Sequence, residues 1–153
     1  MPLLHYCLSV ICSKGCKLEL QNSITRENLK TLVSLFYERA LNDKDIGNIF
    51  LVEFGDDITN EEWTEHIELL VNFWDSVFLD ETAYNGDPFG PHFTIVNLKN
   101  DHFKPWVDLF TATANEIYVP KVAALFKEKG ELYSKEFIHR LSQETKNSVL
   151  RFM

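Results

Sequence analysis

The feature that most constrains the fold is a run of helix-breaking residues near the middle of the chain. From Tyr84 to Phe93 the sequence reads Tyr-Asn-Gly-Asp-Pro-Phe-Gly-Pro-His-Phe, the densest run of glycine and proline in the chain. Regular structure does not continue through such a stretch, because proline lacks the amide hydrogen and glycine is conformationally permissive. The run therefore predicts an irregular loop between two helical, aromatic-rich segments, and this loop delivers His92.

A histidine that a loop carries into the space between apolar helices is well placed to bind a metal or haem iron. One imidazole nitrogen binds the iron while a backbone carbonyl orients the other. Most loop histidines are solvent-exposed or structural, so His92 becomes a metal-ligand candidate only through its neighbours.

Composition narrows the class of protein. The chain has 153 residues, of which 45% are hydrophobic, as expected for one globular domain. Twelve Phe, five Tyr and three Trp indicate either a bulky core or a pocket for a flat ring ligand. The formal charge of −8 argues against nucleic acid as a partner and disfavours an anionic membrane surface.

The first twenty residues differ from the rest. An apolar run, Leu3–Cys12, is too short to span a bilayer. Three cysteines lie in this segment and form no disulfide framework, so reduced thiols of a cytosolic protein are the preferred account: Cys7, Cys12 and Cys16. We expect residues 1–22 to be a poorly ordered extension and residues 23–153 to be the folded domain. We also expect a cytoplasmic location without stable membrane insertion.

Apolar residues recur at helical spacing along the domain. A first helix is predicted from a Thr25 cap, with Tyr37 at the edge of its apolar face. That face is Leu29, Leu32, Val33, Phe36 and Ala40. A short apolar turn, Ile46–Phe50, follows it.

A second helix is predicted to follow a capping box of Thr59 and Glu62 and to end near Leu79. Its inner face is Trp63, Ile67, Leu70, Phe73, Trp74 and Val77. His66 falls on this face, and a buried imidazole needs a partner. It is either a structural histidine bonded to a carbonyl or part of a ligand pocket.

Two helices are predicted after the loop. The first is capped by Asn100-Asp101, carries Trp106 on its inner face and ends near Tyr118. Pro120 then breaks the chain before a last helix, which Gly130 weakens or kinks. The apolar face predicted for that helix is Val122, Leu125, Phe126, Leu132, Phe137, Ile138 and Leu141. No strand pattern is found, so the fold class is all-α. Three further histidines are assigned to the surface or the N-terminal tail: His5, His102 and His139.

Taken in order, these segments resemble the truncated (two-over-two) haemoglobins, and specifically their group III. The resemblance covers about residues 23–141. The residues that carry it are Phe36-Tyr37-Glu38, Asp45-Ile46-Gly47-Asn48-Ile49-Phe50, Trp63-Thr64-Glu65-His66, Asn72-Phe73-Trp74, Tyr84-x-Gly86-x-Pro88, His92 and Phe103-x-x-Trp106. The sequence departs from the family pattern in its N-terminal extension, in lacking a proline between Thr94 and Asn100, and in Gly130.

The resemblance implies a truncated-globin fold, a two-over-two helical sandwich, that holds haem b (iron protoporphyrin IX). His92 would be the proximal iron ligand, and Tyr37 and Trp106 would be polar groups on the opposite, distal side. His66 would occupy the distal position that controls ligand access. The remaining residues assigned to cofactor binding are Phe50, which would pack on the haem face, and Phe73.

Three classes of function follow. The preferred one is a protein that reversibly binds O2 or a related diatomic ligand such as NO or CO. Tyr37 and Trp106 would donate hydrogen bonds to that ligand. The second is a haem redox enzyme, peroxidase-like or acting on NO or nitrite, which would need an external reductase because these residues include no reductase segment. The third is a non-haem helical interaction domain in which His66 and His92 are structural.

Overall fold

The protein is an all-α domain, which confirms the predicted fold class. A computed structural model describes residues 19–88 and 98–151. Within these residues it contains no β-strand, and an isolated β-bridge joins Gln21 to Tyr118. The helices are α2 (Arg26–Leu41), α3 (Gly47–Phe54), α4 (Glu61–Phe78), a 3-10 turn η2 (Asn100–His102), α5 (Phe103–Ile117) and α6 (Pro120–Arg151).

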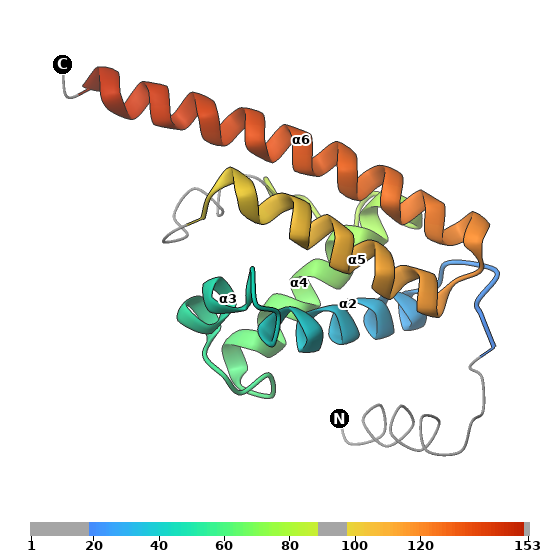
Figure 1. The fold of residues 1–153 in the computed structure, drawn as a ribbon. Helices are drawn as coiled ribbons and strands as arrows, with labels where there is room; N and C mark the ends of the chain where they lie inside the picture. The colour runs from blue at the N-terminus through green and yellow to red at the C-terminus, as the bar shows by residue number, and fades with distance from the viewer. Residues whose placement is uncertain (1–18, 89–97, 152–153) are drawn as a thin grey trace.

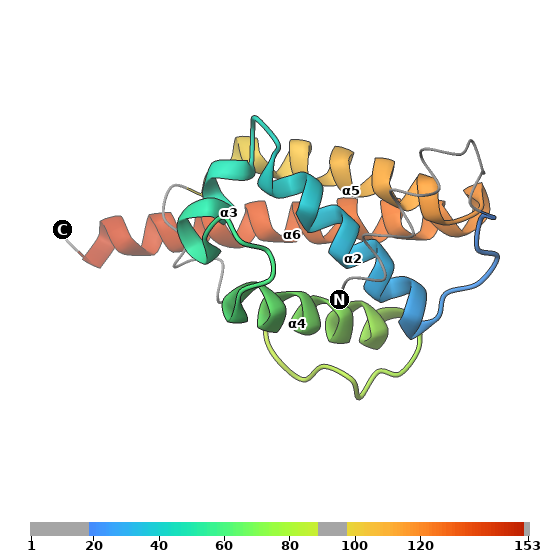
Figure 2. The same ribbon diagram turned by 90° about the horizontal axis from the view of Figure 1, so that it is seen from below.

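The helices form two crossed pairs. Helix α2 packs on α4, α5 packs on α6, and α2 joins the pairs through its contact with α5 (Figures 1 and 2). The short α3 packs against α2. The C-terminal part of α6 extends beyond the other helices in both views. In the described ranges, no helix combines the length and the apolar character that crossing a bilayer requires.

Helix α2 begins where the sequence predicts. The Thr25 hydroxyl accepts a hydrogen bond from the Asn28 amide (3.1 Å), and the Asn28 side chain accepts one from the Thr25 amide (2.9 Å). This reciprocal cap satisfies amides that the first helical turn leaves without partners. Every residue of the predicted apolar face is at most 1% exposed. The α2 assignment is therefore confirmed.

Helix α4 starts one residue later than the predicted capping box. Asn60 is the cap and accepts from the Trp63 amide (2.8 Å). Thr59 cannot serve, because its hydroxyl donates to Asp57 Oδ1 (2.6 Å) within the preceding turn. That hydrogen bond also holds the pKa of the Asp57 carboxyl below its usual value. The prediction of Thr59 as the cap was wrong, although the helix itself is confirmed.

The start of α5 also differs from the prediction. Asn100 and Asp101 do not cap it; they form η2 together with His102, whose Nδ1 accepts from the Lys99 amide (2.9 Å). The imidazole takes the role expected of the Asn100 and Asp101 side chains, so that part of the prediction was wrong.

Helix α6 begins at Pro120 as predicted and runs without interruption past Gly130. Val122 and Phe126 are buried, but Leu125 is 43% exposed and Leu132 is 55% exposed. These two leucines were wrongly assigned to the apolar face. Helix α6 packs mainly on α5 and touches α4 through the rings of Phe126 and Tyr133, so it buries a narrow stripe that leaves both leucines outside.

The centre of the domain is a closed aromatic core. Phe110 stacks on Trp74 (centroids 5.0 Å apart), and Tyr118 stacks on Phe126 (4.8 Å). The Tyr118 hydroxyl donates to Asn28 Oδ1 (2.7 Å), so its polar group is satisfied inside the core. This core fixes α2, α4, α5 and α6 and leaves the space beside it to the candidate site.

Candidate functional site

A cavity of about 350 Å³ opens beside the aromatic core. Its walls come from α2, α3, α4, α5 and α6 and from the segments on either side of residues 89–97, and most of them are apolar rings or aliphatic chains. This volume and lining are typical of a small-molecule or cofactor site.

The structure brings together five of the six residues that the sequence assigns to a cofactor site. Tyr37, Phe50, His66, Phe73 and Trp106 all line this one cavity, although they lie on four different helices. His92 lies outside the described residues. Its role therefore remains a prediction.

Tyr37 belongs to a cluster of ring side chains on the cavity wall. Its ring makes edge contacts with Phe50 (centroids 5.4 Å apart) and His66 (4.9 Å). His66 stacks on Phe54 of α3 at 4.4 Å. Trp106 joins the same cluster through Phe36, at 5.3 Å. Four helices therefore hold the polar residues of the cavity in fixed positions through ring contacts.

The donors on the cavity wall differ from other buried donors. The Trp63 indole donates to the Gly55 carbonyl (2.9 Å). By contrast, neither the Tyr37 hydroxyl nor the indole N–H of Trp74 or Trp106 makes a hydrogen bond within the described part of the chain. Burial raises the pKa of the Tyr37 hydroxyl well above its usual range, so that it stays protonated and able to donate. Within the described ranges, none of these three donor atoms is enclosed by protein without a partner; they lie on the cavity wall and are available to a ligand with an acceptor atom.

The edge of the cavity carries a second set of polar side chains. Tyr84, His102, Tyr133 and Ser134 line it alongside the donors described above. The Tyr84 ring folds back over Gly86, where an added Cβ would lie 2.6 Å from the Tyr84 hydroxyl. Glycine at this position therefore lets the ring lie against the loop backbone.

An ion pair ties the same loop to the long C-terminal helix. Asp87 and Arg140 of α6 lie 3.8 Å apart, and both are about half exposed. Phe73 extends the attachment by contacting Tyr84 at 5.6 Å and Tyr133 at 5.2 Å. The loop is thus anchored on α4 and α6, across the edge of the cavity.

Sequence reasoning missed some of the lining residues. His102 was assigned to the surface, but it is half-buried and lines the cavity. The signal was present, since His102 lies four residues before Trp106 and therefore on the same helical side. Trp74 was recognised only as a core residue, but it also lines the cavity. Tyr133 gave no signal, because α6 offers a continuous helical pattern in which cavity and core positions look alike.

The donor set fits a flat, largely apolar ring group with a bound acceptor ligand. Apolar walls favour burial of a planar ring, and Tyr37 and Trp106 supply donors. Imidazole side chains from two directions, His66 on α4 and His102 on η2, add nitrogen atoms. The residues present are therefore compatible with haem.

Comparisons with known proteins place the sequence and the fold among known relatives. No protein-family model matches the sequence. The chain is 30% identical over 119 residues to a group 3 truncated hemoglobin of Campylobacter jejuni, and the match covers 78% of this chain and 92% of that protein. Its fold is similar to the crystal structure of group III truncated hemoglobin from Campylobacter jejuni, with a TM-score of 0.74 and 29% identity, over 80% of this chain and 95% of the other.

Proposed function

The chain belongs to the group III truncated haemoglobin family, and from this premise we propose that it holds haem b in the aromatic cavity and reversibly binds O2 at the haem iron. One observation of the structure supports the proposal in addition to family membership. The buried Tyr37 hydroxyl lines the cavity and makes no hydrogen bond within the described residues. A bound diatomic ligand would supply the missing acceptor.

We propose His92 as the proximal iron ligand. Pro88 and Leu98, the described residues on either side of its segment, both line the cavity. The segment that carries His92 therefore starts and ends at the cavity wall.

Haem would supply an iron atom with an open coordination position for a diatomic ligand. The chain's own residues would then decide how long the ligand stays. Tyr37 and Trp106 line the cavity and would supply hydrogen-bond donors to such a ligand, an interaction that favours a ligand carrying partial negative charge, as O2 does on ferrous iron. A hydrogen bond to a charged acceptor contributes about 1.5–3 kcal/mol, or roughly ten- to hundredfold in retention. Carbon monoxide gains less from the same donors, so the cavity favours O2.

Titration of the apoprotein with haem tests the proposal. We expect saturation at one haem per chain, a sharp Soret band and a stable spectrum under O2. Failure to saturate, or a broad Soret band that a surface site would also give, would contradict it.

Replacing the donor tests the role of Tyr37. Tyr37→Phe should speed O2 dissociation about ten- to hundredfold, measured by stopped flow against CO. Tyr118→Phe is the matched control, because Tyr118 is equally buried but lies outside the cavity lining. Equal dissociation rates in wild type and Tyr37→Phe would remove Tyr37 from the proposed role.

A redox enzyme is the second candidate function. The ring of His66 lies 4.9 Å from that of Tyr37, so the cavity holds two polar side chains side by side. Such groups would polarise a bound peroxide or stabilise a developing anion. Steady turnover with peroxide or NO and an added reductant would favour catalysis, whereas reversible binding alone would favour O2 binding.

A further inference from the structure

The outer side of α3 and α4 exposes apolar side chains next to the cavity. Val52 is 61% exposed, Leu51 43% and Leu69 46%. Single exposed leucines are ordinary, but these lie on two helices that pack together through the Phe54 and Trp63 rings, 4.9 Å apart. We call the exposed side of these two helices the α3–α4 face.

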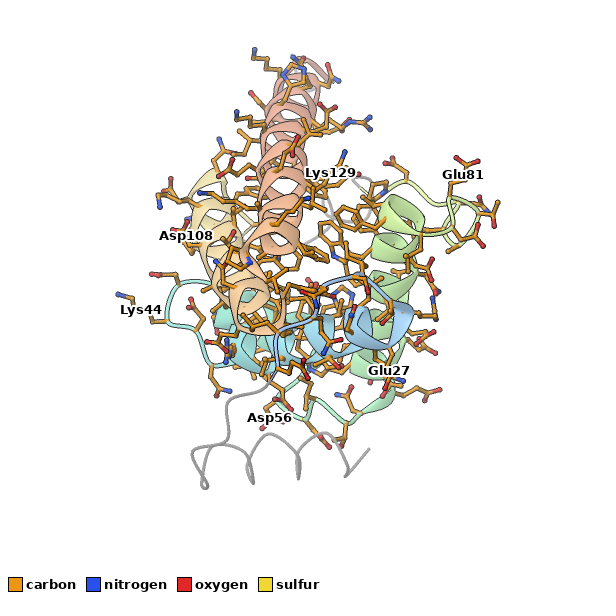
Figure 3. All side chains as sticks on the ribbon, turned by 90° about the vertical axis from the view of Figure 1, so that its right-hand side faces the viewer. Glu27, Lys44, Asp56, Glu81, Asp108 and Lys129 are labelled. Carbon is orange, nitrogen blue, oxygen red and sulfur yellow. The ribbon has the colours of Figure 1, made fainter. Side chains whose placement is uncertain are left out.

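Charge is strongly segregated toward this face. Residues 45–98 contain twelve of the 23 Asp and Glu residues and none of the 15 Lys and Arg residues. The rest of the chain therefore has fifteen cations against eleven carboxylates, a formal charge of +4 beside −12. Oxygen-tipped side chains line the outer edge of α4 in Figure 3, while Lys44 lies on the opposite side of the molecule.

Only a little of this negative charge is neutralised by neighbouring elements. Arg26 of α2 pairs with Asp75 (2.9 Å) and Glu68 (2.7 Å), and Arg140 lies 3.8 Å from Asp87. Glu61, Glu62 and Glu65, on the first turns of α4, are exposed and take part in no ion pair within the described residues. The face therefore keeps a strong negative potential around its exposed apolar side chains.

The face reaches the cavity itself. Glu53 of α3 and Leu69 of α4 are both exposed to solvent, and both line the cavity. A molecule bound on the face would therefore lie against a cavity wall that is one side chain thick. This position suits a partner that exchanges electrons with the group inside.

We propose that the α3–α4 face docks a soluble redox protein whose own redox centre is surrounded by Lys and Arg, and that this protein reduces the haem. The proposal rests on the haem-binding function proposed above. One electron would leave the partner's reduced centre and convert ferric to ferrous iron, with no atom or proton transferred.

Charge complementarity selects this partner over others. A cationic protein is steered to a face with an excess of exposed carboxylates, whereas nucleic acids and anionic lipid surfaces are repelled. The exposed Leu51, Val52 and Leu69 supply apolar contact inside the charged rim, as in weak electron-transfer complexes of small interface area.

The first experiment measures docking. The probe is mitochondrial cytochrome c, a basic one-electron redox protein, added to the ¹⁵N-labelled, haem-loaded chain. We expect amide shifts concentrated on α3 and α4. The affinity should fall at least tenfold when ionic strength rises from about 0.02 M to about 0.2 M, because salt screens exposed charges.

Matched charge variants locate the site. Glu62→Gln/Glu65→Gln should weaken cytochrome c binding about three- to tenfold. Glu128→Gln/Glu131→Gln on α6 removes the same charge and should change it less than twofold. Equal weakening by both pairs, or shifts centred on α6, would overturn the docking site, as would absence of binding at low salt. The Soret band of each sample reports haem loading separately, so failure of haem binding is distinguished from failure of docking.

A second readout tests electron entry. Reduction of the ferric protein by the cationic complex hexaammineruthenium(II) should slow with added salt and with Glu62→Gln/Glu65→Gln, but not with the α6 pair. A reduction rate that does not respond to either change would overturn electron delivery through this face.

Discussion

Two buried tyrosines of the same core differ in their surroundings, because Tyr37 lines the cavity and Tyr118 does not. Tyr118 is 0% exposed and Tyr37 is 4% exposed. Tyr118 stacks on Phe126 and donates to Asn28 (2.7 Å), so both its ring and its hydroxyl are satisfied. Tyr37 has comparable ring contacts, at 4.9 Å to Phe36 and to His66, but its hydroxyl lacks a partner within the described residues.

The difference has an energetic meaning. Pairing a buried hydroxyl, as Tyr118 does, contributes about 1 kcal/mol to stability, whereas the Tyr37 hydroxyl faces the cavity and makes no such contribution within the described residues. The contacts of Tyr118 therefore stabilise the apoprotein. The Tyr37 side instead keeps a cavity with a hydrogen-bond donor on its wall.

Replacing one phenylalanine of each region by alanine should give the largest difference in the free energy of unfolding. Phe126 is 0% exposed and contacts four other rings, so Phe126→Ala should reduce the free energy of unfolding by about 3–5 kcal/mol. Phe50 is only half-buried at the cavity wall, and Phe50→Ala should cost the apoprotein about 1–2 kcal/mol. Urea unfolding of the apoproteins measures both. Equal losses would mean that the cavity wall is as essential to the fold as the core.

A matched pair of hydroxyl deletions comes next. Tyr118→Phe should destabilise the apoprotein by about 1–2 kcal/mol, because Asn28 loses a donor. Tyr37→Phe should change stability by less than about 0.5 kcal/mol, because no protein hydrogen bond is lost within the described residues. The comparison fails if thermal or urea unfolding shows the opposite order.

Alkaline pH should act on both regions alike. Burial raises the pKa of Tyr37 and of Tyr118 above the ordinary value, so both stay protonated in the folded state. Their contribution to stability is complete below about pH 10, where an unfolded tyrosine is still neutral. Above that pH the unfolded chain releases protons that the folded chain keeps. Stability should then fall by about 1.4 kcal/mol per pH unit for each buried tyrosine.

Single phenylalanine substitutions at these positions check the assignment. Tyr37→Phe and Tyr118→Phe should each make the fall less steep by about 1.4 kcal/mol per pH unit, as measured by urea unfolding between about pH 9 and pH 11.5. An unchanged slope in either variant would show that its tyrosine ionises in the folded protein.

The smallest expected effect lies at the boundary between the two regions. A Cβ added at Gly130 would lie 3.6 Å from Phe110 of the core and 3.9 Å from Trp106 of the cavity, which are ordinary contacts. Gly130→Ala should therefore stabilise the protein by about 0.5–1 kcal/mol through helix propensity. A loss of stability would indicate that α5 and α6 approach more closely than these distances show.

Helix positions were largely predictable because they follow local rules. The apolar face of α2 and the Thr25 cap are set by residues within one or two turns. Predictions failed where a side chain chose between two nearby partners. Thr59 donates to Asp57 instead of capping α4. The helix was expected to be capped by Asn100 and Asp101, but it is the His102 side chain that accepts a hydrogen bond, from the Lys99 amide. Leu125 and Leu132 were misassigned because the width of a buried stripe depends on the packing partner.

The candidate site could be predicted from the order and spacing of the motifs that carry the family resemblance. The helical periodicity of apolar residues alone did not predict it. Tyr37, His66 and Trp106 stand on helical faces where a core residue would look the same. Their common cavity follows only from the crossing of α2, α4 and α5. Tyr133 was missed because long-range packing, and not local spacing, brings it to the cavity, whereas for His102 the spacing of four residues from Trp106 was overlooked. The division of the chain at residues 22 and 23, the cytoplasmic location and the role of His92 stay predictions.

The most direct test of the account is the spectrum of the haem-loaded protein in which each cavity histidine candidate is replaced in turn. Ferrous absorption and the iron–histidine stretching band should be lost or altered in His92→Ala and restored by added imidazole. His66→Ala and His102→Ala should keep the wild-type band, although both side chains line the cavity. A wild-type spectrum in His92→Ala, or loss of the band in His102→Ala, would contradict the account.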